Sequence, residues 1–174
     1  MQFLKTIAAL CAFAASSLSS AYEVIVTESQ IQQNITSRMP LTRQGKMMSV
    51  TLDNTVVDLL GNGNRVRIQS DIALLTTIGL QSRGNLTAEG DVRFDDDSDS
   101  FFIDNPQVID LNIDGVPAAY KPSVIQLAQQ TLAPAFSGQA VYVLKDDGTQ
   151  ALARMLLRTM TIDEHQVVLD FSPF

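Results

Sequence analysis

The chain is poor in the residues on which much protein chemistry depends. Its 174 residues include one cysteine (Cys11), one histidine (His165) and no tryptophan. A single cysteine cannot form an intramolecular disulfide, and this set leaves little for metal sites or for Cys-His and Ser-His catalysis. Basic residues are also few, since 12 Lys and Arg stand against 19 Asp and Glu, giving a formal charge of −7. Because nucleic-acid binding depends on clustered basic residues, the composition argues against that class of partner.

The rest of the composition is typical of a folded globular protein, with 45% hydrophobic and 18% charged residues. The length predicts one domain. The first segment predicts a secretory signal peptide, because Lys5 precedes an apolar run over residues 6–15 and small residues follow up to Ala21. That run is shorter than the roughly 20 apolar residues that cross a bilayer. We expect cleavage after Ala21, a single mature domain over residues 22–174, and export to the periplasm.

Cys11 could in principle be a lipid-attachment site, which would tether the protein to a membrane. Such a site needs a small residue before the cysteine, whereas Leu10 precedes Cys11 here. Cys11 also lies inside the apolar run, so we interpret it as part of the removed signal peptide. The mature chain then has no cysteine, and its folding depends on a hydrophobic core.

The mature chain begins with a β-rich run, residues 22–26, followed by Thr27 as a helix N-cap with Gln30 at the capping-box spacing. A helix through Ile31 and Ile35 is expected to end before Pro40. From residue 48 the apolar period becomes two, which predicts a meander of antiparallel strands that are apolar on one face. The second of these runs has its apolar residues on one face over about 15 residues: Val66, Ile68, Ile72, Leu74, Ile78 and Leu80.

A third alternating run covers residues 86–94, and a fourth covers residues 101–113 with a bend or bulge expected at Pro106. Helical spacing follows from Pro122 to Phe136, with Pro134 expected to kink or shorten the last turn. Beyond it the pattern predicts a strand over residues 140–144, a turn over 145–148, a second helix over 150–160 and a closing strand over 167–171. The predicted class is therefore α+β, a twisted antiparallel meander packed on the helix of residues 122–137.

Three polar segments are candidate sites. Asp110–Gly115 has the opening spacing of a calcium loop, but Lys121 stands where the closing Glu belongs, so a strand ending in an Asp-Gly turn is favoured. The acidic run Asp95–Asp99 is interpreted as a solvated hairpin tip. His165 has no nucleophile motif associated with it and is interpreted as a surface-turn residue. The sequence therefore predicts no catalytic residue, metal site or cofactor.

Two parts of the sequence carry a family resemblance. Residues 142–150 (YVLKDDGTQ), followed by a predicted apolar helix and a closing strand, resemble the C-terminal signature of the YceB-like bacterial envelope proteins (DUF1439), a family of unknown function. Residues 26–31 (VTESQI) resemble its N-terminal strand-helix junction. Family members are typically lipoproteins. Their fold is similar to tubular lipid-binding (TULIP, BPI-like) proteins, which implies a half-barrel sheet wrapped on a long helix with apolar ligands between them.

Amphipathic strands with one apolar helix make either a closed, dry core or a site for a hydrophobic ligand. The resemblance favours non-covalent binding of a lipid or other apolar molecule. The residues expected to line that site come from the sheet face and the helix: Val66, Ile68, Ile72, Leu74, Ile78, Leu127, Leu132 and Phe136. The alternative is an envelope interaction module with a dry core, acting through its acidic surface. Contact with a membrane surface or an envelope protein is a further expectation, and an enzyme is the weakest reading.

Overall fold

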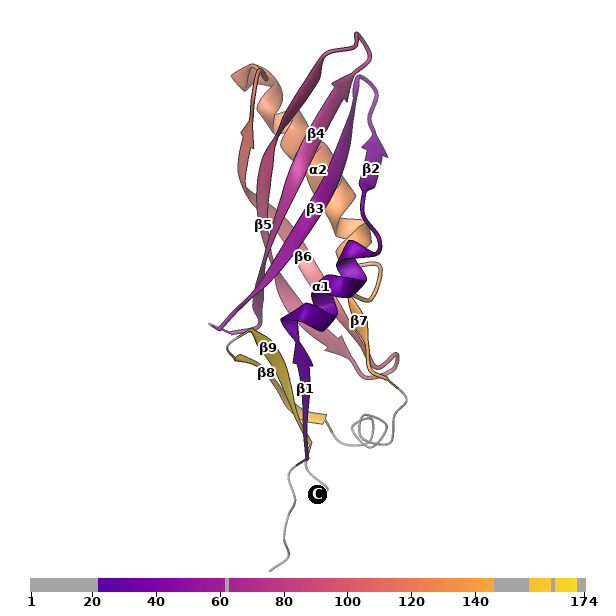
Figure 1. The fold of residues 1–174 in the computed structure, drawn as a ribbon, viewed down its shortest axis with the longest axis vertical. Coiled ribbons are helices and arrows are strands. Elements are labelled where there is room, and N and C mark those ends of the chain that lie inside the picture. The colour runs from indigo at the N-terminus through magenta and orange to yellow at the C-terminus, as the bar shows by residue number, and fades with distance from the viewer. Residues whose placement is uncertain (1–21, 62, 146–156, 164, 172–174) are drawn as a thin grey trace, which may run out of the picture.

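The structure is a computed structural model that describes residues 22–61, 63–145, 157–163 and 165–171 (Figure 1). The predicted signal peptide, including Cys11, lies outside these residues. The fold is α+β, as predicted, with two antiparallel sheets and two α-helices in the described part.

The larger sheet is antiparallel and has six strands in the order β2-β3-β4-β5-β6-β7. Their bounds are β2 (Leu41–Gln44), β3 (Met48–Leu60), β4 (Arg65–Thr76), β5 (Gln81–Asp95), β6 (Ser100–Ile113) and β7 (Tyr142–Val143). Strands β3 to β6 have 12 to 15 residues each, and the sheet they form is twisted and open. Inward and outward side chains alternate along β4, where every second residue from Val66 to Leu74 is buried.

Three register shifts interrupt the long strands, one between β3 and β4 and two between β5 and β6. The β3–β4 register shifts between Asp53 and Val56, and the β5–β6 register shifts beside Pro106, where a bend was predicted. The β3 bulge and the bulge beside Pro106 each contain an asparagine with a φ of 47°, Asn54 in β3 and Asn105 in β6. Asparagine adopts this left-handed backbone region more readily than other non-glycine residues, and such bulges increase the local twist.

Helix α2 (Lys121–Phe136) lies across one face of this sheet, preceded by the 3-10 turn η1 (Ala118–Tyr120) (Figure 1). It packs mainly on β6 and also on β2 and β3. Pro122 lies in its first turn, where a missing N–H costs nothing. The helix continues past Pro134 to Phe136, so the last turn is not shortened as expected.

The smaller sheet has the order β1-β9-β8, built from β1 (Tyr22–Thr27), β8 (Leu157–Asp163) and β9 (Gln166–Phe171). Helix α1 (Glu28–Thr36) begins directly after β1, and the Thr27 N–H donates to Gln30 Oε1 at 2.9 Å, as the capping-box spacing predicted. In Figure 1 the small sheet lies at the end of the molecule opposite to the β4–β5 turn.

The predicted helix over residues 150–160 is wrong where the structure describes it. Residues 157–160 belong to β8, which pairs with β9, whereas residues 150–156 lie outside the described residues. Thr159, Thr161 and Ile162 are β-branched and favour a strand, and an available edge of β9 decides the conformation. The predicted strand over 140–144 is reduced to β7, and the short strand β2 was not predicted. Of the predicted turn over 145–148, residues 146–148 lie outside the described part.

One apolar cluster joins the helices to both sheets. It contains buried residues from β1, α1, β4, α2 and β9, such as Val24, Ile31, Ile68, Leu132 and Leu169. A sheet with one apolar face must be covered, and here α1 and α2 cover that face.

Candidate functional site

The residues predicted to line an apolar site lie in this cluster, with one exception. Four are on the inward face of β4 and three are on α2, all of them buried: Val66, Ile68, Ile72, Leu74, Leu127, Leu132 and Phe136. The periodicities of 2 and 3.6 therefore identified which faces meet. That these residues bind a ligand stays a prediction.

Ile78 is the exception, and its expected place on the sheet face is wrong. Strand β4 ends at Thr76, and Ile78 is 89% exposed in the turn that follows. The apolar alternation in the sequence continues through this turn. Gly79, whose φ is 84°, reverses the chain inside the alternating run.

Polar contacts fasten helix α2 to β6. The Gln129 side chain accepts a hydrogen bond from the Val108 N–H (2.9 Å) and donates to the Pro106 carbonyl. The Ser137 hydroxyl donates to the Ile103 carbonyl at 2.9 Å. No hydrogen bond of the described residues joins α2 to β2 or β3, where apolar contacts hold the helix. The two long sides of α2 are therefore held differently.

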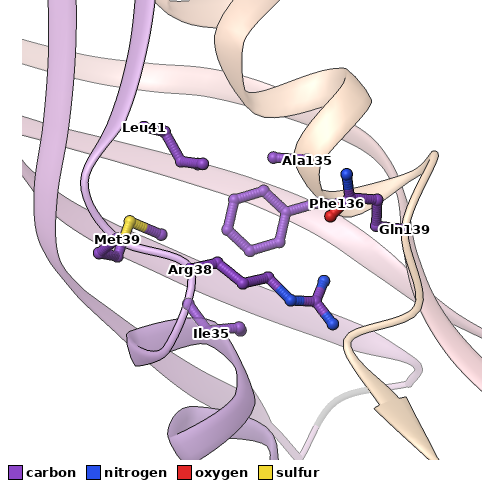
Figure 2. Close-up of a pocket in the computed structure, with 7 residues that line it drawn as sticks. All are labelled: Ile35, Arg38, Met39, Leu41, Ala135, Phe136 and Gln139. Atoms are coloured by element: carbon purple, nitrogen blue, oxygen red, sulfur yellow. The ribbon is translucent and has the colours of Figure 1, made fainter.

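A small cavity of about 50 Å³ opens on the β2 side, near the C-terminal end of α2 (Figure 2). We call this region the α2–β2 seam. Its walls come from α1, the segment that follows α1, β2 and α2, and they are mostly apolar: Ile35, Met39, Leu41, Ala135 and Phe136, with Arg38 and Gln139. Ile35 and Phe136 belong to the buried cluster, so the cavity borders the core directly.

Arg38 is the charged residue of this cavity. Figure 2 shows its side chain running beside the Phe136 ring, with the guanidinium group near Gln139. Its Nη2 donates to the Ala140 carbonyl at 2.5 Å, whereas Nη1 is buried and has no hydrogen-bond partner among the described residues. A buried donor of a charged group costs free energy until it meets an acceptor. The α2–β2 seam thus combines an apolar wall with a buried N–H donor that has no acceptor among the described residues.

A groove of about 210 Å³ adjoins the cavity and shares Leu41, Ala135 and Gln139 with it. Arg43, which is exposed on β2, lines this groove. Neither Arg38 nor Arg43 forms an ion pair with a described residue, in contrast to Arg65 and Arg67, which both pair with Glu89. The seam therefore offers two cationic groups beside an apolar surface.

The sheet face also buries one polar pair that the apolar pattern did not predict. The hydroxyls of Thr55 and Ser70 lie 2.9 Å apart and are both buried, and Ser70 also contacts the Asp53 carbonyl at 2.9 Å. These contacts satisfy the hydroxyls next to the β3 bulge.

His165 lies in the turn between β8 and β9 and meets two carboxylates that the sequence did not associate with it. Its Nδ1 lies 3.1 Å from Glu28 Oε2 and 3.5 Å from Asp58 Oδ1. The three ligand atoms lie within 4.8 Å of one another and are of the kinds that hold a divalent transition metal. Glu28 Oε2 also accepts the Leu59 N–H at 2.9 Å, so hydrogen bonding already explains why these groups converge.

The other polar segments follow their predicted roles. Asp96 to Asp99 form the turn between β5 and β6, and Asp110 lies in β6, which ends before an Asp-Gly turn. Next to the acidic turn, the Arg93 guanidinium donates a hydrogen bond to the Asp104 carboxylate, which raises the pKa of Arg93. An open hollow of about 500 Å³ over β3, β4 and β5 is lined mostly by polar residues, among them Asp53, Asp71 and Arg83.

Sequence reasoning had no signal for Arg38. It follows the last turn of α1 and precedes Met39 and Pro40, an environment without a recognised motif. Its position becomes informative only when α1 and α2 are packed together.

Among the described residues, no helix has both the length and the apolar character that a membrane span requires.

A protein-family model matches most of the chain. No curated protein matches the chain. The family model described as "Protein of unknown function (DUF1439)" matches residues 26–166, which run from β1 to the first residue of β9. The chain therefore belongs to the DUF1439 family.

Proposed function

We propose that the protein binds an anionic amphiphile, such as a fatty acid, without catalysis. The acyl chain lies between α2 and the sheet, and the anionic head meets Arg38 at the α2–β2 seam. The single observation that carries the proposal is the buried Arg38 Nη1, which meets no acceptor in the described part of the chain and lies in an apolar cavity that borders the core. With the predicted signal peptide, this binding takes place in the periplasm.

Charge complementarity supports an anionic head. The guanidinium group binds carboxylate or phosphate oxygens through parallel N–H donors, and such bonds are stronger than neutral ones. In a protein of net charge −7, two arginines that form no ion pair with any described residue lie at one apolar seam, and this local positive charge attracts an anion. The cavity has room for a few water-sized groups, which suits a compact head such as a carboxylate.

Apolar burial supplies the rest of the driving force. Each Å² of acyl chain removed from water contributes about 25 cal/mol before association costs are subtracted. The acyl chain of the ligand extends from the α2–β2 seam toward Leu132 and Leu127 when α2 moves outward. The side chains of Gln129 and Ser137 fasten α2 to β6, so the β2 side is the one that opens.

Filling the cavity tests the location of the site. Ala135→Trp adds an indole at the wall of the cavity without removing a core side chain, since Ala135 is only half-buried. The matched control is Gln130→Trp, which adds the same group at an exposed position of α2. Titration with a fluorescent polyene fatty acid should show wild-type affinity in the control and at least about a tenfold loss in Ala135→Trp, as expected for excluded burial of several methylenes.

Equal affinity of both folded variants would place the site elsewhere. If the wild-type protein takes up no fatty acid or phospholipid, the ligand-binding proposal fails. The alternative is then an interaction module with a dry core, which should show a reproducible protein crosslink in cells that weakens with salt.

A further inference from the structure

Four large apolar side chains are exposed at one end of the molecule. We call them the apolar tip: Met47, Leu75, Ile78 and Leu80, with Ile78 89% and Met47 69% exposed. They lie in or beside the β2–β3 and β4–β5 turns, which a hydrogen bond from the Thr77 N–H to the Met47 carbonyl (3.0 Å) holds together. In Figure 1 both turns lie at the end opposite to the three-stranded sheet.

The β4–β5 turn presents Ile78 on a fixed backbone. The Thr76 N–H donates to the Leu80 carbonyl (2.9 Å), and the Leu80 N–H donates to the Thr76 hydroxyl (3.0 Å). The Gly79 N–H also donates to the Thr76 carbonyl at 3.0 Å. Single exposed apolar residues are normal, but a group of them held on two adjoining turns is typical of an interaction surface.

The charge around the apolar tip is opposite to that of the whole chain. Residues 42–52 and 72–84, which contain both turns, include Arg43, Lys46 and Arg83 but no Asp or Glu. All three basic residues are exposed. Elsewhere the chain is acidic enough to reach a net charge of −7. Apolar side chains combined with cations are complementary to a partner whose surface is anionic and whose interior is apolar.

We propose that the apolar tip docks on an anionic lipid bilayer, with Ile78 and Met47 entering the headgroup region and Lys46 contacting anionic headgroups. A stable protein interface usually covers about 800 Å² on each partner and 20 to 30 residues a side, and two adjoining turns offer much less. Shallow insertion of a few apolar residues assisted by basic ones is enough for reversible membrane binding. This contact is independent of the ligand-binding proposal.

Flotation with vesicles tests the docking. The wild-type protein should bind vesicles containing phosphatidylglycerol and bind neutral phosphatidylcholine vesicles more weakly, by about fivefold for each contributing cation. The double variant Met47→Ser/Ile78→Ser should lose about tenfold or more of this binding because its apolar insertion is removed. The control is Val56→Ser/Ile109→Ser, which removes two exposed apolar side chains outside the tip. Its binding should equal that of the wild type.

A single introduced tryptophan reports insertion directly, because the chain has none. The emission of Ile78→Trp should shift to the blue on addition of phosphatidylglycerol vesicles, and that of Ile109→Trp should not. Folding is not at risk, since both positions are exposed, and thermal unfolding checks this. Wild-type protein that binds no vesicle, a tip variant that binds like wild type, or an unshifted Ile78→Trp emission overturns the proposal.

Discussion

Replacing Arg38 by methionine separates a structural role of this residue from a ligand-binding role. The substitution keeps an unbranched apolar side chain beside Phe136 and removes the guanidinium group. Two effects on stability then oppose each other. Loss of the charged hydrogen bond to the Ala140 carbonyl costs about 1.5–3 kcal/mol, whereas removing the buried Nη1, for which the described residues supply no acceptor, returns about 1–3 kcal/mol.

The free energy of unfolding should therefore change by no more than about 2 kcal/mol. Ile35→Ala supplies the benchmark from the same cavity, because Ile35 is fully buried and its truncation should cost about 2–5 kcal/mol. The affinity for oleate should fall roughly 10- to 100-fold, the value of a charge-assisted hydrogen bond. The affinity for oleyl alcohol, which has the same chain and no charge, should stay within about twofold of wild type, since apolar burial is kept.

The assays are urea unfolding followed by circular dichroism, and displacement of a fluorescent fatty acid at about pH 8, where carboxylate and arginine are both charged. Arg83→Gln is the control for net charge, because Arg83 is exposed on the outward face of β5. A loss of more than about 3 kcal/mol in Arg38→Met would show that Arg38 is structural. An unchanged oleate affinity would refute the assignment of the head to Arg38.

Two further predictions concern the framework that holds the site. Gly84→Ala should destabilise the protein by at least about 2 kcal/mol, because the added Cβ would collide with the backbone carbonyl of Asn112 on β6. The control is Gly61→Ala, whose Cβ meets no atom within 4 Å, and its thermal unfolding should be nearly that of the wild type. Glu28→Gln should lower the free energy of unfolding in urea by about 1–2 kcal/mol, because the Glu28 carboxylate accepts a β3 backbone N–H at 2.9 Å and lies in the first turn of α1, where negative charge is favourable. Glu23→Gln, at an exposed position of β1, should change the stability little. Equal effects of the two substitutions would contradict this reasoning.

The sequence predicted best where one period continued over many residues. Alternation placed the inward residues of β4 correctly from Val66 to Leu74, and helical spacing gave the buried residues of α2. Prediction failed at Ile78, where a turn interrupted the period, and over residues 157–160, where pairing with β9 overrides the local helical pattern. The first failure is local, because Gly79 makes a turn inside the run, whereas the second comes from tertiary context that a short window does not contain.

The candidate site was predictable only as a face. Periodicity can show that Leu132 and Ile68 point into one core, but it cannot show where packing leaves space. The position of Arg38 depends on how α1 meets the end of α2, two segments about a hundred residues apart in sequence. The convergence of His165 with Glu28 and Asp58 depends in the same way on the pairing of β1 with β9.

The most direct test of ligand binding is mass spectrometry of the protein purified from an exporting bacterial host. Native and denaturing spectra of the same sample are compared, and the bound molecule is extracted for identification. The proposal predicts about one anionic amphiphile per chain, present in the native spectrum and lost on denaturation. A bare chain in the native spectrum, which also takes up no added oleate, would contradict it.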